Sequence, residues 1–241
     1  MTEQAAALIN FADQQLSAKK LRAAVLFPNT ELPSAAAEAA LARAKETGWT
    51  NIVKIPYPAT TFEASKVAQQ LKAEGTAAVF IFGGTDVDDF LRAAGALEWT
   101  PYVLSLGALT SRDLPANVPA AFTKKVFLAF PTVPTDLTPD GLAEYRALAE
   151  KYKLPPQHAA AQLAALAAAK TFVEALKRAG ADLSREQLVT ALEGLYEYDT
   201  GLTPKLIFGP NRHVGAAGAY VITINSETKG FVSASGWVAA H

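Results

Sequence analysis

The sequence predicts an α/β protein with an open, doubly wound parallel sheet and an additional helical portion. Five short, nearly continuous apolar runs have strand length, at 21–27, 51–57, 77–82, 102–106 and 125–130. Stretches of helical period separate these runs, and strands that are apolar on both faces are typical of a parallel sheet covered by helices. Right-handed crossovers between successive strands then give the open, doubly wound arrangement.

Polar residues in front of the helical stretches indicate where three helices begin. Ser34 is expected to cap the first of them, which is rich in alanine. Thr60 and Glu63 have the spacing of a capping box for the second. Asp86 can cap the third, which follows the strand over 77–82. These signals place one helix after each of the first three strands.

The second half of the chain changes to a series of helices. Thr138 followed by Pro139 has the pattern of an N-cap with proline at the first helical position. A long helix is expected over 158–179, after Pro155–Pro156 and up to Gly180, and its alanine-rich stretch 159–169 should be buried because it is apolar on most faces. Ser184 and Gln187 form a second capping box, which predicts one more helix after it.

The chain is expected to close with a β-hairpin. Two apolar runs, 219–224 and 231–237, flank a polar turn, and this pattern is typical of paired antiparallel strands. Between the strand-rich and helix-rich halves, the stretch 131–139 holds three prolines and is the best candidate for a boundary.

The composition excludes several classes of function. Half of the 241 residues are apolar, so a sizeable core is possible. The 22 Lys and Arg nearly balance the 23 Asp and Glu, and without a basic stripe no nucleic-acid partner is expected. No apolar run approaches the roughly 20 residues that span a bilayer. The absence of cysteine excludes disulfides, thiolate catalysis and Cys-ligated zinc.

No motif for catalysis, a cofactor or a metal stands out. The three histidines are scattered, and the chain lacks the spacings of HExxH, GxSxG, GxGxxG and the Walker loop. The segment 83–86 follows a strand and opens a helix, but it lacks the lysine of a phosphate loop. Asp86, Asp88 and Asp89 are expected to act as favourable first-turn charges on that helix rather than as metal ligands. We therefore expect no catalytic residue, no metal and no cofactor.

Several segments in order resemble the type I periplasmic solute-binding proteins of the leucine, isoleucine and valine type. The stretch 167–180 is similar to the long helix of that family, and 183–194 to the helix that follows it. The letters YDTG at 198–201 and FGPNRH at 208–213 resemble the family's "FDTG…FGPNDH" stretch, and 62–75 is similar to the helix before the third strand. The resemblance spans nearly the whole chain.

The resemblance implies a function and a domain organisation. It implies the solute-binding component of an ABC importer, which binds a small amino acid-like, aromatic or aliphatic acid in a cleft between two lobes without catalysis. A membrane permease would be the partner and the periplasm the location, although no signal peptide is visible in the first ten residues. Residues 16–130, with 217–240 returning to them, are expected to form the ligand-binding lobe. Residues 131–216 would be the helical remainder of the other lobe, most of which is missing.

Ligands of open α/β sheets bind at the carboxyl ends of the strands, which locates a candidate site. The Gly83–Gly84 pair would let backbone approach a ligand, although a tight turn alone also explains it. The resemblance singles out Thr85, and it implies an acid after the fourth strand, where this chain has Gly107. Tyr57 could instead cap the sheet edge, and Phe130 could be core. The expected ligand-binding residues are Asn29, Tyr57, Gly83, Gly84, Thr85, Ser105, Gly107 and Phe130.

Two other functions and one association stay open. A ligand-sensing domain of a receptor would have the same fold, and a flavodoxin-like enzyme would need a phosphate loop or an acid–base pair at the strand ends. The apolar helix over 158–179 needs a covering partner, so homo-oligomerisation through it is possible.

Overall fold

The computed structural model describes residues 1–111, 113–181, 183–225 and 227–241. It divides into two compact units, one formed by 1–130 with 217–241 and the other by 131–216.

The first unit is built on a seven-stranded sheet in the order β2-β1-β3-β4-β5-β6-β7. The first five strands are parallel, and the last two add antiparallel to β5 as a hairpin, so the sheet is mixed. The predicted parallel sheet and the closing hairpin are both confirmed. The strands are β1 (Ala23–Pro28), β2 (Ile52–Tyr57), β3 (Ala78–Ile81), β4 (Tyr102–Leu106), β5 (Val126–Phe130), β6 (Gly218–Asn225) and β7 (Gly230–Ala239).

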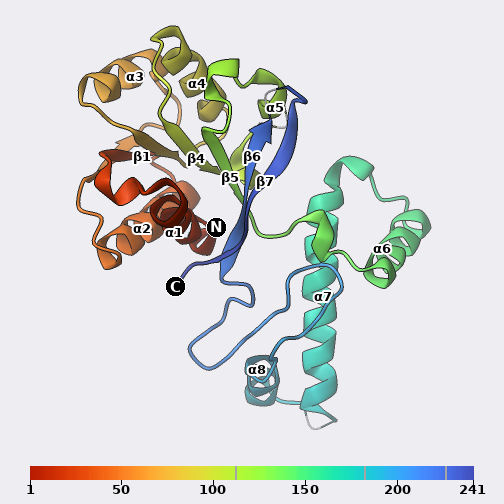
Figure 1. Cartoon of the computed structure of the whole chain (residues 1–241). Coiled ribbons are helices and arrows are strands. Elements are labelled where there is room, and N and C mark those ends of the chain that lie inside the picture. Colours follow the sequence, from red (N-terminus) through yellow and green to blue (C-terminus); the bar gives the residue numbers. More distant parts are fainter. Residues whose placement is uncertain (112, 182, 226) are drawn as a thin grey trace. The chain divides into compact units, whose positions relative to one another are not determined.

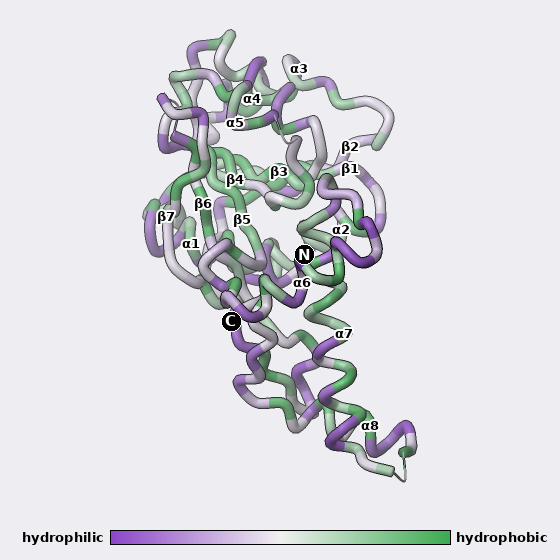
Figure 2. Tube along the Cα trace, turned by 90° about the vertical axis from the view of Figure 1, so that its right-hand side faces the viewer, coloured by the Kyte–Doolittle hydropathy of each residue, from purple (hydrophilic) through white to green (hydrophobic). Residues whose placement is uncertain are grey.

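Helices cover both faces of this sheet (Figure 1). Alternate residues of a strand point to opposite faces, so each face has its own core. Along β1, Val25 and Phe27 belong to the cluster that contains the residues of the first two helices, and Leu26 belongs to the cluster on the other face. Strands β1, β3, β4 and β5 are hydrophobic along most of their length, as their burial requires (Figure 2), whereas β2 and β7 carry exposed residues. The helices are α1 (Thr2–Leu16) and α2 (Glu31–Glu46) on one face, and α3 (Ala64–Ala73), α4 (Asp86–Ala96) and α5 (Leu114–Asn117) on the other.

Helix α1 lies outside the lobe expected from the sequence, which began at residue 16. The structure places it in the first unit, where residues from Ala5 to Ala12 are buried against the sheet. The buried Asn10 bonds the helix to β7 and to α2. Its Nδ2 donates to the Ala239 carbonyl at 2.7 Å, and its Oδ1 accepts from Arg43 Nε at 2.7 Å. The middle of α1, from Ala5 to Ala12, is therefore part of the core.

Two predicted helix starts are wrong. Helix α2 begins at Glu31 after Thr30, and the backbone N–H of Ser34 donates to the Thr30 carbonyl at 3.0 Å, so Ser34 lies inside the helix. Helix α3 begins after Glu63 with no side-chain cap, so Thr60 and Glu63 do not form the expected capping box. In both cases a backbone turn follows the strand, closed by the Thr30 N–H on the Pro28 carbonyl and by the Thr61 N–H on the Pro58 carbonyl, and the spacing of polar residues does not predict where the helix begins after it.

The second unit contains the three helices expected there, α6 (Pro139–Lys151), α7 (Ala159–Ala179) and α8 (Arg185–Glu193). Thr138 Oγ1 accepts from the Gly141 N–H at 3.1 Å, which confirms the predicted cap. The capping box is also confirmed, since Ser184 Oγ accepts from Gln187 N at 3.2 Å and Gln187 Oε1 from Ser184 N at 3.1 Å.

The YDTG segment packs against the start of α6. Gly201 has a φ of 73°, a conformation that favours glycine, and its carbonyl accepts from the Thr138 N–H at 2.9 Å. A Cβ on Gly141 would lie 2.4 Å from the Gly201 carbonyl oxygen, so neither position has room for a side chain. These contacts hold the YDTG segment, which follows α8 in the chain, against the start of α6.

Helix α7 corrects one expectation about membranes. It is long and apolar enough to cross a membrane by length and composition alone, which corrects the expectation that no apolar run approaches that length. Core helices of soluble proteins have the same length and composition. Phe172 and Val173 on this helix are 49% and 46% exposed.

Candidate functional site

The parallel strands bring the predicted residues to one edge of the sheet in the first unit. Pro28 of β1 is paired with Tyr57 of β2, and Ile81 of β3 is paired with Ser105 of β4. Because the strands run in the same direction, their carboxyl ends and the loops after them lie side by side. This edge is the candidate site.

A tyrosine–aspartate pair stands at the end of β2. The Tyr57 hydroxyl donates to Asp86 Oδ2 at 2.5 Å, and Tyr57 is buried. A Cβ on Gly83 would lie 2.2 Å from the Tyr57 Oη and 2.3 Å from Asp86 Oδ2. A side chain at position 83 would therefore collide with the hydrogen bond between Tyr57 and Asp86, so the position requires glycine. The neighbouring Gly84 is exposed, and its Cβ would meet only the Leu109 carbonyl at 3.5 Å.

The surroundings of Tyr57 keep its hydroxyl protonated. Burial, then the hydrogen bond to Asp86 and the negative charge of Asp86, raise the pKa of Tyr57 well above its ordinary value. The Phe62 ring lies 4.7 Å from the Tyr57 ring, centroid to centroid, and covers it. The phenol is thus fixed as a donor to Asp86.

A second aromatic ring stands over Gly107 at the ends of β4 and β5. A Cβ on Gly107 would lie 2.2 Å from Phe130 Cζ, so the glycine makes room for this ring. The Phe231 ring packs edge-on against Phe130 at 5.9 Å. The position where the resemblance implied an acid is thus a glycine packed against an aromatic ring.

The other predicted residues differ in their access to solvent. Asn29, Gly84 and Thr85 are exposed at the edge. Ser105 is fully buried, and its hydroxyl donates to the Ile81 carbonyl at 2.6 Å, so its hydroxyl already has a partner in the core. This burial supports a structural role for Ser105 and removes it from the surface where a solute could enter.

The sequence reading missed the role of Asp86. Helix α4 follows Thr85 without a side-chain cap, so the expected capping by Asp86 is wrong. The carboxylate instead turns toward Tyr57, which is 29 positions earlier in the chain. Only the strand register brings these two residues together, and no local motif could have revealed the pair.

The other two acids in the first turn of α4 have different partners. Asp88 is 8% exposed, its Oδ1 accepts from Asn117 Nδ2 at 3.3 Å, and its Oδ2 is buried without a hydrogen bond. Asp89 pairs with Arg92 on the surface. Within the described residues no group of three or more His, Cys, Asp or Glu could hold a metal ion.

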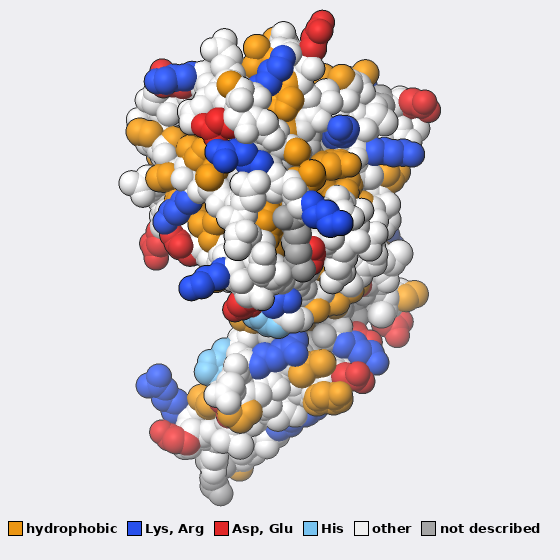
Figure 3. Space-filling model, turned by 60° about the vertical axis from the view of Figure 1, so that its left-hand side comes forward, with side chains coloured by type: hydrophobic (Ala, Val, Ile, Leu, Met, Phe, Trp, Pro, Cys, Tyr) orange, Lys and Arg blue, Asp and Glu red, His pale blue; other side chains and the backbone are white. Residues whose placement is uncertain are grey.

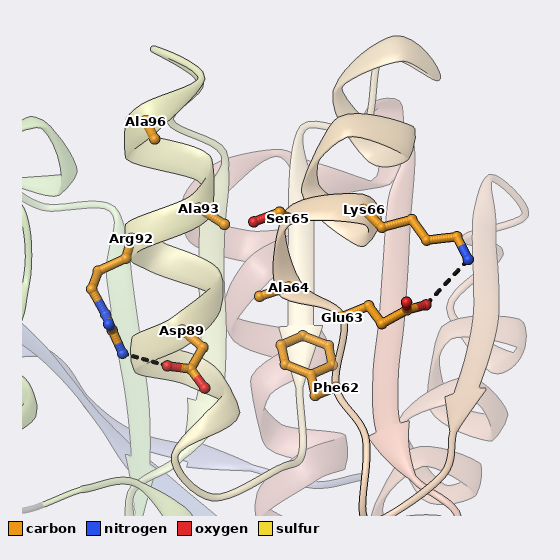
Figure 4. Close-up of a pocket in the computed structure, with 9 residues that line it drawn as sticks. All are labelled: Phe62, Glu63, Ala64, Ser65, Lys66, Asp89, Arg92, Ala93 and Ala96. Atoms are coloured by element: carbon orange, nitrogen blue, oxygen red, sulfur yellow. Dashed lines mark hydrogen bonds and ion pairs between the residues drawn. The ribbon is translucent and has the colours of Figure 1, made fainter.

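A shallow groove of about 650 Å³ runs between α3 and α4 (Figure 4). None of the predicted ligand-binding residues lines it. Phe62 and Asp89 lie at the end near the helix N-termini, and Ala96 lies at the other end. Two surface ion pairs, Glu63–Lys66 and Asp89–Arg92, flank an alanine-lined floor. The groove is open to solvent and lacks the enclosure of a small-molecule site.

The surface charges are mixed. Lys and Arg side chains are interspersed with Asp and Glu on the face shown in Figure 3. This distribution agrees with the near-zero net charge of −1. The candidate edge therefore gains little from long-range electrostatic attraction, and short contacts decide what it binds.

The sequence and the fold are similar to those of known proteins. A sequence model for a family described as periplasmic binding protein matches residues 2–230. No curated protein matches the chain in sequence. Several solved structures match its fold at low identity.

A leucine-binding protein from Thermotoga maritima has 16% identity and a TM-score of 0.73, with 99% of this chain and 65% of that protein covered. A branched-chain amino acid ABC transporter protein from Thermus thermophilus, with bound valine, has 18% identity and a TM-score of 0.72, with 99% and 65% covered. A fatty acid ABC transporter substrate-binding protein from Thermomonospora curvata has 18% identity and a TM-score of 0.71, with 98% and 62% covered. The chain thus spans less than two thirds of the length of these proteins.

Proposed function

The chain belongs to the periplasmic binding protein family, whose sequence model matches residues 2–230, and from this premise we propose that it is the solute-binding component of an ABC importer. It binds a small molecule at the carboxyl edge of the first unit's sheet and performs no chemical step. Its partner is a membrane permease, and it works in the periplasm or outside the cell.

One observation carries this proposal. Five parallel strands end at a common edge, which is where ligands bind in open α/β sheets. That edge has the half-buried ring of Phe130 and the exposed Asn29 and Thr85 above the buried Tyr57. A few polar groups among apolar ones are typical of small-molecule sites.

The relatives suggest what class of solute to test. One binds leucine, another was solved with valine, and a third is a fatty acid-binding protein. Leucine, valine and fatty acids all combine a carboxylate with an apolar chain. We propose a solute of that kind for this chain, either amino acid-like or an aromatic or aliphatic acid.

A thermal-shift screen tests the proposed function. The probes are branched-chain and aromatic amino acids, fatty acids and benzoate, each at millimolar concentration. A ligand present at about 100 times its dissociation constant stabilises the folded state by about 2.7 kcal/mol, which raises the melting temperature measurably. Sugars and nucleosides serve as controls of unrelated chemistry. No shift with any acid, or a shift with sugars alone, would contradict the proposal.

Self-association through residues 158–179 is a separate prediction, and no comparison supports it. The exposed Phe172 and Val173 on α7 are its basis. We expect the mass from light scattering to rise with protein concentration, and Phe172→Glu to abolish the rise. A monomeric mass throughout the concentration series would refute it.

A further inference from the structure

The groove between α3 and α4 carries a charge pattern that the candidate site does not use. Glu63 stands directly before α3, and Asp89 lies in the first turn of α4. Lys66 and Arg92 follow three residues later on the same two helices and pair with these acids. Two acids near one end of the groove are thus followed, about one helical turn along it, by two bases (Figure 4). These four residues are called the charge patch below.

The charge patch is accessible to another molecule. The side chains of Lys66 and Arg92 are 74% and 70% exposed, and those of Glu63 and Asp89 are 60% and 44% exposed. Ion pairs as exposed as these stabilise a helix only weakly, because water competes for both partners. Each charged group can therefore bind a second group of opposite sign.

Small side chains form the floor of the groove between these charges. Ala64, Ser65, Ala93 and Ala96 line it, and Phe62 lies at the end near the helix N-termini (Figure 4). Side chains of this size let a facing helix approach closely, because the distance between packed helices depends on the residues at their contact. The open groove therefore suits facing helices better than it suits an enclosed small molecule.

The order of signs in the charge patch is complementary to itself. A two-fold axis that runs across both helices, midway between the acids and the bases, places a second copy with its helices antiparallel to the first. Glu63 of each copy then faces Lys66 of the other, and Asp89 of each faces Arg92 of the other. Parallel helices would instead set acid against acid and base against base. A different protein would need the reversed order on two helices, whereas a second copy has that order by symmetry.

The same charges disfavour two other kinds of occupant. An anionic lipid surface or a nucleic acid would be attracted by Lys66 and Arg92, but it would be repelled by Glu63 and Asp89 beside them. The charge patch therefore fits a protein surface that carries both signs in a fixed order.

We propose that the exposed faces of α3 and α4 form a symmetric, antiparallel interface between two copies of this chain. The acids of each copy bind the bases of the other across the alanine-lined floor. The interface belongs to the first unit and is separate from residues 158–179, which belong to the second. Because exposed ion pairs are individually weak, the dimer is expected to be weak and sensitive to salt.

Charge-reversal variants of the full chain test the inference. Lys66→Glu with Arg92→Glu makes the charge patch wholly acidic, and Glu63→Lys with Asp89→Lys makes it wholly basic. Sedimentation equilibrium up to millimolar concentration is expected to show a dimer for the parent chain and a monomer for each variant alone. Mixing the acidic variant with the basic one is expected to restore a dimer, because opposite charges then face each other again.

Two controls isolate this interface from other effects. The parent chain and all variants also carry Phe172→Glu, which removes an exposed apolar side chain from α7 and with it any association through residues 158–179. Lys124→Glu with Lys153→Glu changes the net charge as much as the acidic variant does, at exposed positions outside the groove. This control should dimerise like the parent, and circular dichroism checks that every variant is folded.

The parent chain also allows a test that needs no change in the charge patch. Raising NaCl from about 0.1 M to about 1 M shortens the Debye length from about 10 Å to about 3 Å, and the dimer should weaken at least about tenfold. An interface held by apolar contacts alone would keep its affinity, since salt screens charge and not apolar burial.

Several outcomes would overturn the inference. They are a monomeric parent at every concentration, an affinity that salt leaves unchanged, a dimer formed by either charge variant alone, and a mixture that stays monomeric. Loss of the dimer in the Lys124 and Lys153 control would attribute the effect to net charge and would also overturn it. Solute binding is measured separately by the thermal-shift screen, so either proposal can fail without the other.

Discussion

At the scale of single residues, two glycines of the candidate edge serve contacts within the protein. Gly83 lies beneath the hydrogen bond from Tyr57 to Asp86, and Gly107 lies beneath the Phe130 ring. The sequence suggested that glycine at such a turn lets a ligand approach the backbone or simply allows the turn. The structure provides a third reason, which is room for another side chain.

Replacing Gly83 with alanine should therefore destabilise the chain. The new Cβ would displace Tyr57 or Asp86 and break their hydrogen bond, and overpacking of this kind typically costs about 1–3 kcal/mol. Gly84→Ala is the matched control, because its Cβ meets only one atom at an ordinary distance of 3.5 Å. Urea unfolding of both variants measures the difference. Equal stability of the two variants would show that Gly83 is not constrained as described.

Tyr57 should make stability depend on alkaline pH. Its pKa is raised in the folded state, so the folded chain keeps the phenol proton that the unfolded chain loses near the ordinary tyrosine pKa. The stabilisation is complete below pH about 10 and falls above it, by at most about 1.4 kcal/mol per pH unit for this one group. Urea midpoints measured from about pH 8 to about pH 11 should fall less steeply for Tyr57→Phe than for the wild-type chain.

A second tyrosine variant controls for the other groups that titrate in this range. Tyr152 is 61% exposed, so Tyr152→Phe should retain the full alkaline slope of the wild-type chain. An identical slope in all three proteins would contradict the assigned environment of Tyr57.

At the scale of elements, helix α1 shows what a buried polar side chain can do. Its apolar residues pack in the core, with the Phe11 ring 5.0 Å from the Phe127 ring, and Asn10 adds hydrogen bonds both to the last strand and to α2. Both partners come from distant parts of the chain. The helix is thereby fixed to the same unit as the C-terminal strand.

Asn10→Ala should loosen this docking. It removes the donor to the Ala239 carbonyl and the acceptor of Arg43 Nε, although Arg43 keeps its contact with Glu46, and each lost hydrogen bond costs about 0.5–1.5 kcal/mol. Gln14→Ala on the exposed side of the same helix should change stability by less than about 0.5 kcal/mol. Hydrogen exchange should show faster exchange along α1 in the first variant only. Unchanged exchange there would mean that apolar packing alone holds the helix.

At the scale of the whole molecule, charge gives little preference for a polymeric anion. The net charge is −1, and the two signs are interspersed on the face shown in Figure 3. Proteins that bind nucleic acids gain most of their non-specific affinity from clustered Lys and Arg.

We therefore expect no binding of duplex DNA or single-stranded RNA by fluorescence anisotropy, even at low salt, where phosphate contacts are strongest. A basic protein of similar size serves as the positive control. Salt-dependent binding in the micromolar range would reveal a basic surface that the composition conceals.

The sequence by itself determined the parallel sheet, the closing hairpin and the caps at Thr138 and Ser184. Those features follow from the order of apolar runs and from contacts between residues three positions apart. Only the tertiary structure decided that Asp86 faces Tyr57, that Gly83 must be glycine, and that Asn10 fastens the first helix to the last strand. These depend on strand register and chain crossing, which bring residues 29 and 229 positions apart into contact, and no local pattern encodes such distances.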